Sequence, residues 1–150
     1  MTLIIETGDP RDPQATALLT ASHALMESLF PPEDNHYLSI DALCTPDIHF
    51  FIAREGTTTL GCGALAQRDG YGELKSMFVA EEARGKGVAD ALMRQLEDHA
   101  RTLKLSALKL ETGSLLHAAH KVYKRHGFTL CGPFCSYSEN ETSVFMEKQL

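Results

Sequence analysis

A turn with two glycines, Gly85 and Gly87, joins a strand-like segment to the most regular helical pattern of the chain. Before the turn, residues 72–79 alternate apolar and polar side chains, as a half-buried strand does. After it, residues 87–103 carry apolar side chains at helical spacing, at Val88, Leu92, Leu96 and Leu103. Strands that alternate with amphipathic helices build layered sheets covered by helices. This segment therefore predicts an α/β protein.

The remaining segments predict that this unit belongs to a mixed sheet. A strand at 2–7 precedes a helix that begins after Pro13 and ends before Pro31. Apolar and β-branched runs at 48–54 and 57–66 form a three-strand meander with 72–79. The other predicted elements are a strand at 107–112, a helix that Ser114 can cap and Gly127 ends, and strands at 128–131 and 143–148. This order predicts a mixed sheet with helices on both faces and a ligand site at the carboxyl ends of its central strands.

Length and charge narrow the class of protein. The chain has 150 residues, 43% of them hydrophobic, which suits one core and one domain spanning 1–150. The net charge of -6 leaves no basic stripe for nucleic acid and favours a cationic or amine-bearing substrate. No apolar run approaches the ~20 residues that span a bilayer, and residues 1–10 lack the basic and apolar regions of a signal peptide. We therefore expect a cytoplasmic protein without a membrane partner.

The cysteines and histidines give a weak signal for a metal. The four cysteines, Cys44, Cys62, Cys131 and Cys135, are scattered, as reduced thiols are in cytosolic proteins. A zinc set can be assembled from Cys131, Cys135, His117, His120 and His126. Its Cys-x3-Cys and His-x2-His spacings match structural zinc sites poorly, so we expect no metal. A metal-binding or redox protein remains a third interpretation.

The sharpest chemical feature is the range 82–89, Glu-Ala-Arg-Gly-Lys-Gly-Val-Ala. Its glycines let the backbone approach a ligand, and the first N–H groups of the following helix point at an anion. A pyrophosphate suits this turn, and Arg84 and Lys86 can add charge. The alternative is an ordinary solvated turn. A phosphate-binding loop of the nucleoside triphosphatase type fits poorly, because no Lys-Ser or Lys-Thr pair follows the glycines.

Three segments occur in the order typical of one enzyme family: 72–79, 84–89 and 119–128. Arg84, Gly87 and Ala89 match that family's pattern of Arg or Gln, two residues, Gly, one residue, then Gly or Ala. On these residues, and over nearly its whole length, the chain resembles the GNAT acetyltransferase superfamily. Residues 111–113 and 143–148 resemble one of its bacterial branches.

The resemblance implies a splayed central sheet with acetyl-CoA between the strands at 72–79 and 107–112. The cofactor-binding residues that it implies are Met77, Phe78 and Val79 at the strand end, Arg84, Gly85, Lys86, Gly87, Val88 and Ala89 in the turn, and Tyr123. Tyr123 matches the tyrosine that protonates the departing thiolate, although its ring can also serve as a core anchor. The family commonly carries an Asn seven residues earlier, where this chain has Leu116.

A general base is needed because an amine of pKa ~10.4 is protonated at neutral pH. Glu73 is the first candidate, since it lies six residues before Val79, in the register of the glutamate base in the histone-acetylating branch. Glu111, at the end of the facing strand, is the second. For either, a solvated or salt-bridged carboxylate is the alternative.

His36, Tyr37 and Phe30 lie in the N-terminal region that shapes the acceptor pocket in the family, and they are the substrate-side candidates. The expected function is transfer of an acetyl group from acetyl-CoA to an amine of a small molecule, a peptide or a protein. A non-catalytic acyl-CoA sensor with the same fold is the alternative. The sequence leaves the oligomeric state open, a homodimer included.

Overall fold

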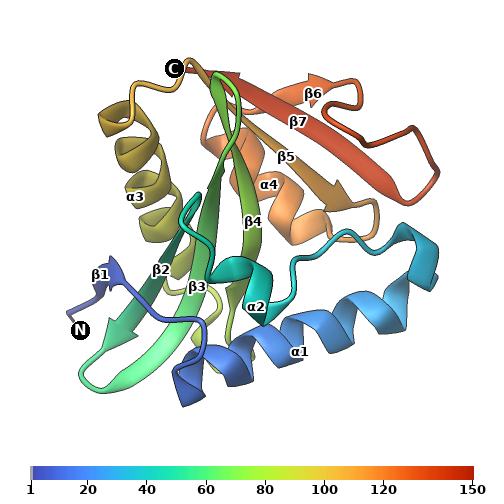
Figure 1. Cartoon of the computed structure of the whole chain (residues 1–150). Coiled ribbons are helices and arrows are strands. Elements are labelled where there is room, and N and C mark those ends of the chain that lie inside the picture. The colour runs from blue at the N-terminus through green and yellow to red at the C-terminus, as the bar shows by residue number, and fades with distance from the viewer. Residues whose placement is uncertain (1) are drawn as a thin grey trace.

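A seven-stranded mixed sheet organises the computed structural model, which describes residues 2–150 (Figure 1). Residue 1 of the predicted domain lies outside the described part. The strand order is β1-β2-β3-β4-β5-β7-β6, and only β4 and β5 pair in parallel. The strands are β1 (Ile4–Thr7), β2 (Ile48–Glu55), β3 (Thr58–Gln67), β4 (Tyr71–Val79), β5 (Ala107–Gly113), β6 (Thr129–Cys131) and β7 (Ser143–Gln149). The predicted mixed α/β sheet is confirmed.

The three long helices fall where the hydrophobic periodicity predicts them. The helices are α1 (Pro13–Leu29), α2 (Ile40–Leu43), α3 (Val88–Thr102) and α4 (His117–Arg125), with 3-10 turns at Pro32–Asp34 and Glu81–Ala83. The sequence did not predict α2 or the 3-10 turns, which are too short to show a period. The predicted cap at Ser114 is wrong, because Leu116 is the N-cap of α4 and no side chain caps this helix.

Helices cover both faces of the sheet, with α1 and α2 against one face and α3 against the other (Figure 1). The contact between α3 and β3 depends on two glycines. A Cβ atom at Gly61 would lie 3.3 Å from Leu92 Cδ1, and one at Gly63 would lie 3.1 Å from Leu96 Cδ1. The helix therefore packs almost on the strand backbone, and it buries the apolar face that the sequence predicts.

The sheet splays between β4 and β5. The two strands pair only from Tyr71 with Ala107 to Leu74 with Leu110, although β4 continues to Val79. Just past the last pair, β4 carries a β-bulge, where Ser76 and Met77 face a single residue of β3. Ser76 has a φ of 56°, a conformation that non-glycine residues rarely adopt. The bulge bends β4 away from β5 and opens a gap between their carboxyl ends.

Within residues 2–150, no helix combines the length and the apolar composition needed to cross a membrane.

The end of β5 packs tightly against Phe30, and we expect Gly113→Ala to destabilise the fold. A Cβ atom at Gly113 would lie 2.5 Å from Cε2 of the buried Phe30 ring, so the ring must shift. Such overpacking costs about 1–3 kcal/mol of unfolding free energy, measured by urea denaturation. Gly132→Ala is the control, because a Cβ atom there meets nothing within 4 Å. Equal stability of the two variants would contradict this packing.

Candidate active site

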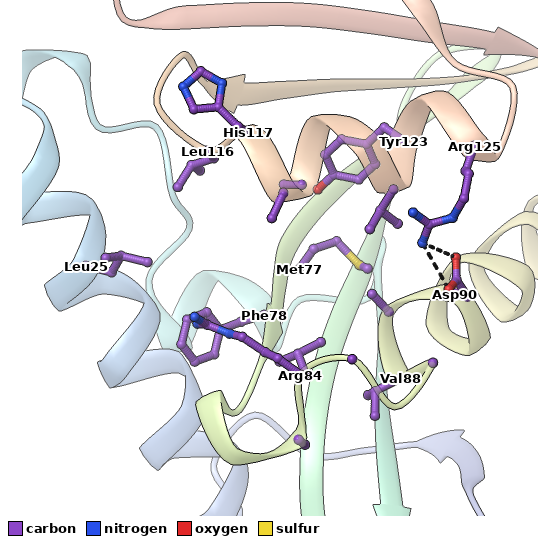
Figure 2. A pocket seen from close by; sticks show the side chains of 18 of the residues that line it. Leu25, Met77, Phe78, Arg84, Val88, Asp90, Leu116, His117, Tyr123 and Arg125 are labelled. Atoms are coloured by element: carbon purple, nitrogen blue, oxygen red, sulfur yellow. Dashed lines mark hydrogen bonds and ion pairs between the residues drawn. The ribbon is translucent and has the colours of Figure 1, made fainter.

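A cleft of about 670 Å³ lies beside the free end of β4, and α1, α4 and the start of α3 form its other walls (Figure 2). We refer to this space as the large cleft. Most of the predicted cofactor-contacting residues line it: Met77, Phe78, Val79, Arg84, Gly85, Gly87, Val88, Ala89 and Tyr123. Lys86 is exposed in the same turn and is not among the lining residues. The fold thus brings three separate segments of the sequence to one cavity.

The turn before α3 presents unpaired backbone donors to the large cleft. Gly85 and Gly87 each have a φ of 79°, which suits glycine, and Gly87 is the N-cap of α3. No side chain caps the helix, so the N–H groups of its first turn remain available to an anion. The Arg84 guanidinium lies over the ring of Phe78, with Cζ 5.8 Å from the ring centroid. The turn therefore combines helix-terminal donors with one adjacent cation.

The side chain of Tyr123 points from α4 towards Met77, with its hydroxyl in the cleft (Figure 2). The end of α4 holds it there. Gly127 N–H donates to Lys124 O at 3.0 Å, and Phe128 N–H donates to Tyr123 O at 3.1 Å, which is a Schellman motif with Gly127 at a φ of 90°. The Phe128 and Tyr123 rings pack with centroids 6.0 Å apart. Burial, with a contribution from Glu111, raises the pKa of Tyr123 far above its usual range.

A second, smaller cavity of about 110 Å³ adjoins the large cleft, and we call it the inner pocket. Met26, Met77, Leu116, Ala119 and Tyr123 line both spaces. The inner pocket is also lined by all three predicted substrate-side residues, Phe30, His36 and Tyr37. The Tyr123 side chain, which bears the hydroxyl group, therefore borders both cavities.

Glu111 lies in the wall of the inner pocket, at the carboxyl end of β5. Its Oε2 accepts a hydrogen bond of 2.7 Å from the Ser143 hydroxyl. Burial raises the pKa of Glu111 above its usual range, while the Ser143 hydrogen bond acts in the opposite direction. A carboxylate in this environment can hold a proton closer to neutral pH than an exposed one does.

Glu73 lies in a buried ion cluster and lines neither the large cleft nor the inner pocket. Its side chain is 1% exposed. Its Oε1 accepts hydrogen bonds from Nε and Nη2 of Arg68, at 3.2 and 3.1 Å. Its Oε2 accepts one of 2.5 Å from the Tyr137 hydroxyl and lies 3.3 Å from Nζ of Lys75. Three hydrogen bonds and one ion pair therefore engage the two carboxylate oxygens.

The family model that matches the chain agrees with this geometry. It describes the acetyltransferase (GNAT) family and matches residues 16–128. This chain belongs to the GNAT acetyltransferase family. The matched range runs from the start of α1 to the Schellman motif after α4, and it contains the whole of β4, the glycine turn and Tyr123.

Curated GNAT relatives cover most of the chain. The IAA acetyltransferase of Azospirillum brasilense is 45% identical over 124 residues, 81% of each chain. The uncharacterised N-acetyltransferase YsnE of Bacillus subtilis is 37% identical over 97% of this chain and 99% of its own. YedL of Escherichia coli, also an uncharacterised N-acetyltransferase, is 36% identical over 97% of this chain and 94% of its own.

Solved structures share the fold. A candidate acyl-CoA N-acyltransferase from Klebsiella pneumoniae superposes with a TM-score of 0.83 at 31% identity, covering 99% of this chain and 98% of its own. The PaiA N-acetyltransferase of Thermoplasma acidophilum, solved in complex with coenzyme A, has a TM-score of 0.78 at 15% identity and full coverage of both chains. At that identity the second likeness concerns the fold alone.

One departure from the GNAT pattern and one contact missed by the sequence lie at the cleft wall. Leu116, in place of the family's Asn, adds an apolar side chain where α4 begins.

Asp90, which helical spacing places near Arg94, instead binds Arg125 of α4 through Oδ1 and Oδ2, at 2.9 and 3.0 Å (Figure 2). His126 lies 2.8 Å from the same carboxylate. This cluster ties α4 to α3 across the cleft, and only the tertiary fold reveals it.

The four cysteines are free thiols. Among the described residues, no three His, Cys, Asp or Glu side chains are arranged to hold a metal ion.

Gly87→Val should weaken acetyl-CoA binding at least tenfold, because its side chain would stand between the cleft and the helix-terminal donors. Gly56→Val is the matched control. Gly56 also has a positive φ, of 59°, with nothing within 4 Å of a Cβ atom, but it lies in the β2–β3 turn. Titration calorimetry on both folded variants separates lost binding from backbone strain. Unchanged affinity in Gly87→Val would remove this turn from the binding site.

Proposed function

We propose that this GNAT protein transfers an acetyl group from acetyl-CoA directly to a primary amine of a small molecule or a peptide. The observation that carries the proposal is the junction of the two cavities at Tyr123. The large cleft suits the long donor, and the inner pocket suits the group that bears the amine. The four free thiols suit a reducing compartment such as the cytoplasm.

The chain would hold acetyl-CoA mainly through backbone groups. The first turn of α3 and the glycine turn offer N–H donors to the pyrophosphate, with Arg84 beside them. The end of β4, from Met77 to Val79, has lost β5 as a partner and can pair with the pantetheine amides as a neighbouring strand would. This path leads from the start of α3 to Met77, where the thioester would meet Tyr123 and the inner pocket.

In the transfer step, the amine nitrogen bonds to the acyl carbon, the carbon–sulfur bond breaks, and the departing thiolate takes up a proton. Tyr123 suits the thiolate side, because its raised pKa keeps the hydroxyl protonated throughout the accessible pH range. Its hydroxyl donates a hydrogen bond to the developing thiolate and passes its proton to the sulfur, and solvent then reprotonates the tyrosine.

On the amine side, freeing a lone pair from an ammonium group of pKa ~10.4 at neutral pH costs roughly 4–5 kcal/mol. Glu111 is the base that we propose, since it lines the inner pocket and has a raised pKa. Glu73, the first candidate from the sequence, remains the alternative. Its oxygens already accept from Arg68 and Tyr137, which leaves little capacity for a substrate proton.

Tyr123→Phe should lower kcat roughly a hundredfold and leave the affinity for acetyl-CoA nearly unchanged, because one hydroxyl donor to the sulfur is lost. Thiol release at saturating substrates measures kcat, and calorimetry measures the affinity. A kcat equal to that of the wild type would reduce Tyr123 to a packing residue. Binding without thiol release from any amine, in the wild type, would instead favour the acyl-CoA sensor.

Glu111→Gln should flatten the pH dependence of kcat/KM. A base with a raised pKa is protonated at low pH, so kcat/KM of the wild type climbs as pH increases through that pKa. Gln keeps the shape but cannot accept the proton. Glu73→Gln is the comparison: its kcat/KM should still increase with pH, even if the absolute value is lower. If Glu73→Gln loses the pH dependence and Glu111→Gln keeps it, Glu73 is the base. If both variants keep it, solvent deprotonates the amine.

A further inference from the structure

The inner pocket has an unusual balance of charge for a site that receives a polar substrate. Its ionisable lining residues, apart from tyrosines, are Asp34, His36, Lys75 and Glu111. Lys75 is the one lysine or arginine among them. Whether an acceptor can carry a carboxylate next to its amine therefore depends on whether Lys75 is free to bind that carboxylate.

The Lys75 ammonium group already has three partners within the protein. Its side chain is buried, and Nζ donates to the backbone oxygen of His36 and to the Tyr137 hydroxyl, both at 2.8 Å. The third neighbour is Oε2 of Glu73, at 3.3 Å. Two of the three ammonium hydrogens are therefore committed to protein groups, and the adjacent Glu73 carboxylate neutralises the charge. Lys75 joins β4 to two loops, and its charge is already paired before a ligand arrives.

The charge of Lys75 is also compensated. Glu73 faces both Lys75 and Arg68 within the buried cluster. Glu111 accepts a hydrogen bond from Ser143, and no described lysine or arginine lies within ion-pair distance of it.

Asp34 is likewise without an ion pair to any residue from 2 to 150. Around the pocket, carboxylates therefore outnumber the cations that pair with them. The pocket attracts an ammonium group and repels a carboxylate.

Size and polarity restrict the acceptor further. The inner pocket holds about 110 Å³. Apolar side chains supply much of its wall: Met26, Phe30, Leu74, Met77, Leu116 and Ala119. A compact body with one or two ammonium groups fits such a space. A carboxylate placed there would lose its hydration, and the lysine in the wall is already paired with Glu73, so its burial would be strongly unfavourable.

We propose that the acceptors are compact, cationic amines that carry no carboxylate beside the amino group, and that the pairing of Lys75 with Glu73 is what excludes free amino acids. This inference rests on the acetyl transfer proposed above. Glu111 receives the reacting ammonium group, and Asp34 attracts a second one where the acceptor is a diamine.

Matched pairs that differ only in the carboxylate test the proposal: ethanolamine with serine, histamine with histidine, and putrescine with ornithine. The decarboxylated member of each reactive pair should have a kcat/KM at least on the order of tenfold higher, since a charged group left unpaired costs that much or more. Calorimetric titration of each pair into the CoA-bound protein measures the same preference without turnover. Equal or better use of the amino acids by both measures would overturn the proposal. Absence of thiol release with a retained binding preference would refute the proposed transfer and keep the specificity.

Glu73→Gln supplies the second test. It preserves the shape of the cluster but removes the countercharge of Lys75 and Arg68, so the preference for the amine within each pair should shrink several-fold. Because the readout is a ratio between two acceptors, a general loss of activity cancels. Glu97→Gln is the control, since Glu97 pairs with Arg101 and Lys148, outside both cavities. An unchanged ratio in Glu73→Gln, or an equal change in Glu97→Gln, would contradict the role of Lys75.

Discussion

The parting of β4 from β5 is the constraint on which the rest of the site depends. Parallel strands normally stay paired along their length, yet here the ladder stops at Leu74 and Leu110. The bulge at Ser76 and Met77 bends β4 at the next step. The positive φ at Ser76 is tolerated because β4 pairs with β3 both before the bulge, at Lys75, and after it, at Phe78. Past the bulge, β4 faces the large cleft on the side where β5 would otherwise pair with it. The cavity and its hydrogen-bonding wall thus have the same origin.

Two glutamates on facing strands acquire different properties from their partners. Glu73 pairs in register with Lys109, which lies two residues before Glu111 on β5. The oxygens of Glu73 are engaged by Arg68, Lys75 and Tyr137. Glu111 has one hydroxyl partner and a raised pKa. A carboxylate whose lone pairs are occupied is a structural element, whereas one that is desolvated and under-bonded can exchange protons. The surroundings of each carboxylate, more than its place in a motif, favour one role over the other.

The sequence predicts those parts of the protein that local physics specifies. The period of α3, the glycine turn at 84–89 and the glycine stop at Gly127 are all local, and each lies where it was predicted. The partners of Glu73 were not predictable, because Tyr137 lies 64 residues away in an irregular loop whose position only the folded sheet determines. Asp90 shows the same limit: its helical neighbour is suggested by spacing, but Nη2 of Arg125, at the end of α4, donates to both of its carboxylate oxygens. Local pattern therefore predicts the segments that line the large cleft better than it predicts the partners of the carboxylates.

This division follows from how each ligand would be recognised. The large cleft is lined by the end of β4 and the first turn of α3, whose main-chain groups are present whatever the side chains are. Only positions such as Gly85 and Gly87 must keep their identity, because their backbone conformation requires it. A fold can then persist at 15% identity with a TM-score of 0.78, as the Thermoplasma protein illustrates. The inner pocket depends instead on side chains brought together by loops, so its specificity can change while the cleft stays the same.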